Sequence, residues 1–151
     1  MPVSDTAVQP PLPGLPEPHL SAIVPVDPRG RHELLRLAAA LAPSLQGPMG
    51  NFITASIATL GIAPAHVDRV VATLPDSGSI ALVDDTLVTL GRRLFLETIG
   101  VRLNRADLRA AERIEAEGDL AYFVVAVARA HCLGVIGAPD LRPTSIERRM
   151  K

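Results

Sequence analysis

The most reactive side chains in this sequence belong to the adjacent pair His131 and Cys132, with Tyr122 earlier in the same apolar stretch. A histidine beside a cysteine can take the thiol proton and leave a thiolate nucleophile. On a helix, however, adjacent side chains point about 100° apart, and the negative end of the helix dipole raises the pKa of a thiol. The pair also fits a small buried cysteine next to a histidine that caps carbonyls before Gly134. The catalytic residues therefore stay unknown, and Tyr122, His131 and Cys132 are the candidates to line a ligand pocket.

No other residues have the spacing of a known catalytic or metal centre. The four histidines lack the i, i+4 spacing of a helical metal site, and one cysteine cannot form an internal disulfide or a cysteine-based metal site. Glu112, Glu115 and Glu117 alternate with Arg109 and Arg113, which is typical of a solvent-facing helix. The sequence has no P-loop, no strand-linked G-x-G-x-x-G and no G-x-S-x-G motif. We expect neither a metal nor a cofactor.

Length and composition predict one domain with an apolar core. The chain has 151 residues, of which 48% are hydrophobic, and a disordered chain does not reach that share. Aromatic residues make up only 3%, so leucine, alanine, valine and isoleucine must build the core, which favours closely packed helices. A net charge of −1 provides no overall basic field, so we expect no binding to nucleic acid or to anionic lipid.

The cellular compartment follows from the same bulk features. A single cysteine, and an N-terminal segment without the apolar core of a secretion signal, predict a cytoplasmic protein. The longest uninterrupted apolar run, 120–128, is far shorter than the roughly 20 residues that cross a bilayer. We expect no association with a membrane.

Residues 1–28 differ from the rest of the chain because they contain eight of its fourteen prolines. Proline removes a backbone donor and disfavours helix at the residue before it, so residues 1–18 are expected to be extended, mostly in a polyproline II-like conformation. Two overlapping P-x-x-P pairs suit a segment that docks on a partner protein. The alternative is a tail that wraps its own fold or a neighbouring subunit.

The remainder of the chain is predicted as an all-α domain over 29–137, followed by a short C-terminal helix or tail over 138–151. Apolar residues recur at helical spacing between proline and glycine stops, which favours a compact bundle of five to seven helices. The segment 79–83 could instead be a short strand. Segment 119–133 is apolar on nearly every side, so we expect a central helix or a subunit interface there. The expected helices cover about 28–42, 50–60, 64–74, 79–99, 104–117 and 119–133.

Residues 53–71 resemble a helix-turn-helix, with Gly61 at the turn. The position four before the glycine usually holds a small residue, and here it holds Ile57. The second helix would offer DNA one arginine, Arg69, and no lysine, whereas a DNA-reading helix needs several donors. An ordinary hairpin of two helices fits the segment better.

The order of apolar and glycine positions resembles the carboxymuconolactone decarboxylase / AhpD-like family of small all-helical proteins. The matching stretches are 33–38, 60–62, 118–123 and 133–135, and the resemblance spans residues 29–137. The family's reactive Cys-x-x-Cys-x-x-x-His motif would fall on Gln46, Met49 and Ile53, so its redox and decarboxylase residues are missing. The resemblance implies a homo-oligomer, a trimer or larger.

Three functions follow from these observations. The first is a non-redox AhpD-like protein that binds a small apolar ligand or serves as an oligomeric subunit. The second is a non-enzymatic adaptor that docks a protein partner through the proline-rich tail or through an apolar helix face. The third is a DNA-binding regulator that uses residues 53–71.

Overall fold

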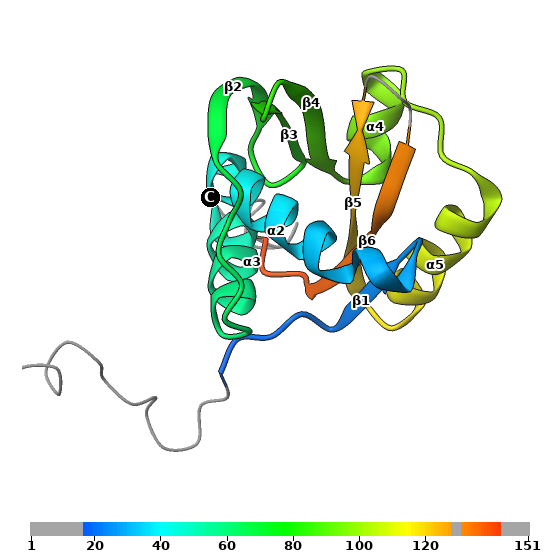
Figure 1. Cartoon of the computed structure of the whole chain (residues 1–151). Coiled ribbons are helices and arrows are strands. Elements are labelled where there is room, and N and C mark those ends of the chain that lie inside the picture. The colour runs from blue at the N-terminus through cyan, green and yellow to red at the C-terminus, as the bar shows by residue number, and fades with distance from the viewer. Residues whose placement is uncertain (1–16, 128–130, 143–151) are drawn as a thin grey trace, which may run out of the picture.

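The structure is a computed structural model that describes residues 17–127 and 131–142, and its centre is a six-stranded antiparallel sheet (Figure 1). The strands lie in the order β1-β6-β5-β4-β3-β2 and comprise β1 (Ala22–Pro25), β2 (Val67–Leu74), β3 (Gly78–Val83), β4 (Thr86–Gly91), β5 (Asp119–Ala126) and β6 (His131–Pro139). The helices are η1 (Pro28–Gly30), α2 (Arg31–Leu41), η2 (Ala42–Leu45), α3 (Pro48–Ala58), α4 (Arg93–Thr98) and α5 (Arg105–Ala116). The predicted all-α bundle is therefore wrong, and the fold is α/β.

Three of the predicted helices are confirmed, namely α2, α3 and α5. Helix α5 buries one side against β5 and β6, and α3 buries one side mainly against α2 and η2. Helix α2 packs on the sheet and is buried on most sides over residues 37–41. Two side chains cap the starts of helical segments. The Asn104 side chain accepts a hydrogen bond from the backbone N–H of Asp107 at 2.8 Å before α5, and Asp27 accepts one from Arg29 at 3.0 Å before η1.

The predicted helix over 79–99 is instead the hairpin of β3 and β4, followed by the short helix α4. The alternative of a strand over 79–83 is thus confirmed. Asp84 and Asp85 form the turn with positive φ values of 50° and 64°, as a two-residue hairpin requires. Apolar side chains occur on both faces of the hairpin. The apolar residues of 79–99 that recur at helical spacing therefore point to opposite faces of the sheet.

Residues 119–133 are not a helix but strand β5, a connection, and the start of β6. Their uniform apolarity has a simple cause, since β5 is a central strand with helices over both faces of the sheet. Alternate residues of β5 point to the two sides, as strand geometry demands. Segment 67–74, the second half of the proposed helix-turn-helix, is the edge strand β2, so that motif is also absent from the fold.

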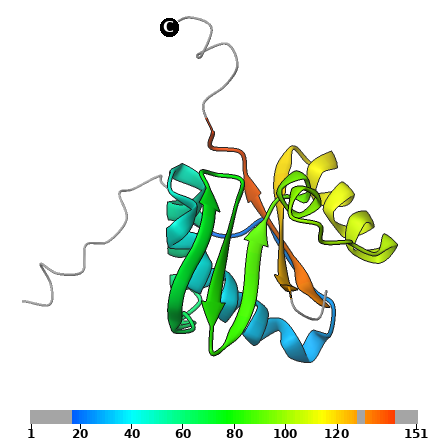
Figure 2. The ribbon, with the colours of Figure 1, turned by 90° about the horizontal axis from the view of Figure 1, so that it is seen from above.

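Two hydrophobic cores lie on opposite faces of the sheet. Figures 1 and 2 show the helices that cover these faces. The first packs α2, η2 and α3 against one face, with Leu120, Tyr122 and Val124 from β5. The second packs α4 and α5 against the other face, with Ala121, Phe123 and Val125 from β5. Within the described residues, no helix has the length and apolarity needed to span a membrane. The first sixteen residues of the proline-rich segment lie outside the described residues, whereas Ala22–Pro25 of that segment form β1. Of the predicted C-terminal helix or tail over 138–151, residues 138 and 139 belong to strand β6, and residues 143–151 lie outside the described residues.

Candidate functional site

The sheet separates the residues that the sequence singled out as site candidates. Tyr122 is fully buried in the core beneath α2 and α3, whereas Cys132 is buried in the core beneath α4 and α5. His131 begins β6 opposite Ala126, and its side chain lies outside the described residues. Tyr122 and Cys132 therefore cannot line one pocket together.

Cys132 has the environment of a structural thiol. Burial raises its pKa to about 12, with a smaller contribution from the carboxylate of Asp107, and the thiol donates at 3.7 Å to the carbonyl of Gly134. A thiol with so high a pKa is protonated near neutral pH and is a poor nucleophile. The interpretation as a small buried cysteine fits this environment.

Tyr122 forms the base of a polar cluster at one end of the sheet. Its hydroxyl donates a 2.6 Å hydrogen bond to the backbone carbonyl of Asp76, and burial raises its pKa far above the ordinary value. Four charged side chains, two acidic and two basic, lie close enough to affect that pKa. We call these residues together with the tyrosine the Asp76 cluster, which consists of Asp76, Arg92, Tyr122, Asp140 and Arg142.

Asp76 joins the turn between β2 and β3 to the first turn of α3. Its carboxylate accepts a hydrogen bond from the backbone N–H of Met49 at 3.2 Å, and its own N–H donates to Leu45 at 3.0 Å. A Cβ atom on Gly47 would lie only 2.6 Å from the Asp76 carboxylate, so only glycine leaves room for this contact. The carboxylate thereby satisfies a free N–H at the positive end of the helix.

Arg92 approaches the cluster from the end of β4. Its backbone N–H donates to Ser77 at 2.8 Å, which ties it to the same turn that holds Asp76. Its side-chain Nε is buried, and among the described residues it has no hydrogen-bond partner. A buried donor without a partner is costly, so Arg92 is the group in this cluster most in need of a ligand acceptor.

Asp140 and Arg142 form the third side of the cluster, just after β6. Two parallel hydrogen bonds of 2.9 Å join the guanidinium to the carboxylate. The hydrogen bonds from Arg142 lower the pKa of Asp140, and the side-chain bond raises the pKa of Arg142. Taken together, the cluster offers two guanidinium groups and two carboxylates, a set that can bind a polar or anionic ligand.

Sequence reasoning did not find the Asp76 cluster because its members come from three separate turns and one central strand. The turn Pro75-Asp76-Ser77 was a local signal, since proline and aspartate followed by glycine favour a turn. Gly78, which directly follows this turn, pairs with Gly91 across β3 and β4. A Cβ atom on either glycine would collide with the Phe95 ring. No group of three or more metal-ligating side chains occurs among the described residues.

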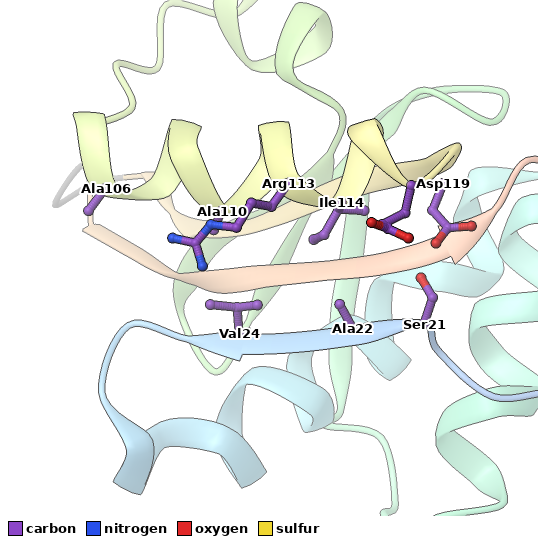
Figure 3. Close-up of a pocket in the computed structure, with 9 residues that line it drawn as sticks. Ser21, Ala22, Val24, Ala106, Ala110, Arg113, Ile114 and Asp119 are labelled. Carbon is purple, nitrogen blue, oxygen red and sulfur yellow. The ribbon is translucent and has the colours of Figure 1, made fainter.

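A separate cavity of about 300 Å³ lies between α5 and strand β1 (Figure 3). Its walls are mostly apolar, with one arginine and two carboxylates. A second cavity of about 400 Å³ continues past Ser21 and Asp119, which line both spaces, towards Phe52 on α3. The first cavity is lined by Ser21, Ala22, Val24, Ala106, Ala110, Arg113, Ile114, Glu117 and Asp119.

No protein-family model matches this chain, and no curated protein matches it. Solved structures do match. The N-domain of HMA8, a copper-transporting P-type ATPase, aligns with a TM-score of 0.63 at 18% identity, over 79% of this chain and 98% of that one. The N-domain of HMA6, also a copper-transporting P-type ATPase, aligns with a TM-score of 0.55 at 19% identity, over 82% and 98% of the two chains.

A zinc-transporting PIB-type ATPase in its E2.Pi state aligns with a TM-score of 0.64 at 25% identity. The match covers 80% of this chain but only 19% of the transporter. These likenesses place the fold among ATPase N-domains, so the resemblance to the all-helical AhpD-like family is wrong. The apolar and glycine positions that carried it occur in strands as well as in helices, and they do not distinguish the two folds.

Proposed function

We propose that this chain is a nucleotide-binding module of the type found in metal-transporting P-type ATPases, with the Asp76 cluster as its binding site. The observation that carries the proposal is the match over 98% of an N-domain solved on its own, in a protein whose substrate is ATP. The proposal replaces the AhpD-like, adaptor and DNA-binding functions expected from the sequence. It concerns binding alone, because four-fifths of the zinc transporter has no counterpart in the match.

The chemistry of the Asp76 cluster suits a phosphate-bearing ligand with polar edges. The buried Nε of Arg92 has no acceptor in the part of the chain that the structure describes, and a phosphate oxygen would supply one. Arg142 holds Asp140 through a two-pronged contact, which is the same geometry that a guanidinium uses for phosphate. Each arginine could therefore bind one phosphoryl group. Arg142 would then exchange the carboxylate of Asp140 for the phosphate.

The carboxylates of the cluster set the strength of binding. Asp76 and Asp140 balance the charges of Arg92 and Arg142, so the site has no net positive charge to attract a triphosphate. Asp76 also occupies the N–H of Met49 at the start of α3. We therefore expect a weak site with a Kd of about 1 mM, or about −4 kcal/mol. Because ATP is a cytoplasmic metabolite, the proposal keeps the protein in the cytoplasm.

Titration with ATP, ADP, adenosine and inorganic phosphate, followed by amide chemical shifts in NMR, tests the proposal. We expect ATP to shift the amides of Ser77, Gly78, Gly91 and Arg92, with adenosine and phosphate each producing a part of the effect. Shifts that are absent at 10-fold excess over the expected Kd of about 1 mM would contradict nucleotide binding. Shifts confined to other surfaces would contradict the site.

A matched pair of arginine variants separates the site from general charge effects. Arg92→Gln should weaken ATP binding by about tenfold, because a charge-assisted hydrogen bond contributes about 1.5 kcal/mol. Arg109→Gln removes an equally charged residue from the exposed side of α5 and should leave the Kd unchanged. Equal weakening in both variants would mean that only the overall charge matters.

A further inference from the structure

The cavity of about 300 Å³ between α5 and β1 has the size and the lining of a site for a small molecule. Ala110 and Ile114 of α5 form one wall, and Ala22 and Val24 of β1 form the other (Figure 3). Val24 is 39% exposed, although it is a large apolar residue. Small-molecule sites have mostly apolar walls and a few polar groups that orient the ligand.

Small residues on α5, β1 and β6 leave this space open. Ala110 lies one helical turn before Ile114 on the buried side of α5, and Ala22 packs on the same side of the sheet. On β6, a Cβ atom at Gly137 would lie 2.9 Å from the Ile114 side chain and 2.8 Å from the Ser21 hydroxyl, so only glycine fits there. Larger side chains at the two alanines would fill the space between the helix and the strand.

The charged groups of the cavity are divided between its two ends. Figure 3 shows the Arg113 side chain extending from α5 into the cavity near Val24, and Asp119 close to Ser21 at the other end. Glu117 also lines the cavity and lies one helical turn after Arg113, just before the chain reaches Asp119. One end of the cavity is therefore positive and the other is negative.

These charges are not paired with one another or with other side chains of residues 17–127 and 131–142. Within those ranges, Arg113, Glu117 and Asp119 form no ion pair and no side-chain hydrogen bond. Arg113 and Glu117 have the spacing of a helical ion pair, but arginine before glutamate is the weaker order of the two. All three side chains can therefore bind a ligand without breaking a contact of the fold.

Charge complementarity defines the ligand. A carboxylate suits Arg113, an ammonium group suits the end with Glu117 and Asp119, and an aliphatic chain suits the apolar walls between them. Ser21 and Val24, which mark the two ends on β1, are about 10 Å apart along the strand. An extended 6-aminohexanoate spans about 7.5 Å from its nitrogen to its carboxyl carbon, which brings one charged group to each end.

We propose that the cavity between α5 and β1 binds an aliphatic ω-amino acid, with its carboxylate on Arg113 and its ammonium group on Asp119 and Glu117. The methylene groups between them lie against Ala22 and Ile114. A ligand with one charged group would leave one end of the cavity without a partner. Nucleotide binding is a separate property, because the cavity and the Asp76 cluster share no residue.

Titration of the full chain with 6-aminohexanoate, hexanoate and hexylamine, followed by amide chemical shifts in NMR, tests the proposal. We expect 6-aminohexanoate to shift the amides of Ala22, Val24, Ala110 and Ile114 with a Kd of about 3 mM. Hexanoate and hexylamine each lack one charged group and should bind about threefold to fivefold more weakly, as expected for one exposed ion pair. 4-Aminobutanoate, about 5 Å long, should also bind more weakly because it does not reach both ends.

Two single variants distinguish the ends of the cavity. Arg113→Gln should weaken 6-aminohexanoate binding about threefold to fivefold without weakening the binding of hexylamine, which has no carboxylate. Asp119→Asn should weaken 6-aminohexanoate binding by a similar factor without weakening the binding of hexanoate, which has no ammonium group. Arg109→Gln and Glu112→Gln remove charges from the exposed surface of α5 outside the cavity, so they are the controls and should leave every Kd unchanged.

Three outcomes would overturn the proposal. The first is the absence of amide shifts along the cavity at about 30 mM 6-aminohexanoate, tenfold above the expected Kd. The second is an equal affinity for 6-aminohexanoate and for either compound with one charged group. The third is an unchanged affinity in Arg113→Gln or in Asp119→Asn. Since the substituted residues are all at least partly exposed, thermal unfolding of each variant should match the original chain within about 2–4 °C.

Discussion

At the scale of single residues, buried hydroxyl groups in this protein bond to backbone carbonyls. These bonds satisfy the groups within the core, and over residues 17–127 and 131–142 they leave no buried hydroxyl paired with a histidine or carboxylate as a nucleophile would need. Tyr122 and Cys132, two of the residues that sequence reading singled out, also bond to backbone carbonyls. The bonds run from Ser56 to Phe52 at 2.7 Å, from Thr89 to Ser79 at 2.8 Å and from Tyr122 to Asp76 at 2.6 Å.

Cys132 provides a prediction for alkaline pH. Its folded pKa of about 12 lies above the ordinary value of 9.0, so above pH 9 the unfolded chain loses a proton that the folded chain keeps. Stability is therefore complete below pH 9 and falls as the pH rises from 9 towards 12, by at most about 1.4 kcal/mol per pH unit. Urea unfolding at pH 8, 9 and 10 measures this fall.

Cys132→Ala supplies the control for that measurement. The variant should lose most of the decrease between pH 9 and pH 10, because Tyr122, whose pKa is also raised, has an ordinary pKa of 10.0 and begins to contribute above it. An identical pH dependence in both proteins would show that the thiol is not the titrating group.

At the scale of elements, helix α3 begins with a cap that comes from a distant turn. Asp76 lies 27 positions after Met49, whose N–H it accepts. Asp76→Ala should destabilise the fold by about 1–3 kcal/mol, since it removes the cap and leaves alanine at a φ of 59°. Urea denaturation measures the loss.

Asp76→Asn is the matched control for the cap. Asparagine keeps an acceptor oxygen and tolerates a left-handed backbone. Asp76→Asn should therefore lower the free energy of unfolding much less than Asp76→Ala does. Equal losses for alanine and asparagine would show that the carboxylate charge, rather than the hydrogen bond, stabilises α3.

The elements that sequence reading identified share one property. Helices α3 and α5 bury one side each, so their apolar residues repeat at helical spacing, and the first half of α2 follows the same pattern. Strands β3, β4 and β5 carry apolar residues on both faces, and a continuous apolar segment has no period that distinguishes strand from helix. The β-branched content of 119–127 and the Asp84-Asp85 turn were the signals that favoured strands.

At the scale of the whole molecule, two cores share one sheet, so β5 in the middle is covered on both faces and β2 at the edge is exposed. This arrangement predicts a gradient of local stability across the sheet. Native-state hydrogen exchange should be slowest for the amides of β5, approaching the rate set by global unfolding. Exchange should be fastest on the open side of β2, whose residues 68–74 are all exposed. Uniform protection across the six strands would contradict this gradient.

The candidate site lies beyond sequence reading for a related reason. Asp76, Arg92 and Asp140 stand far apart in the chain, and no local pattern links them. They meet because β3 and β4 pair antiparallel and bring the turn before β3 next to the end of β4, while β5 places Tyr122 beneath them. Of the predicted site residues, only Tyr122 belongs to this cluster, and it does so through a hydrogen bond that its sequence position does not reveal.

Composition and local pattern, by themselves, determined that this chain has an apolar core with few aromatics and three of its helices. Those features depend on residues a few positions apart, where backbone geometry alone sets the contacts. The tertiary structure decided the rest: the fold class, the faces of β5 and the assembly of the Asp76 cluster. The physical reason is that strand pairing and burial on both faces depend on contacts between distant segments, which leave no periodic trace in the sequence.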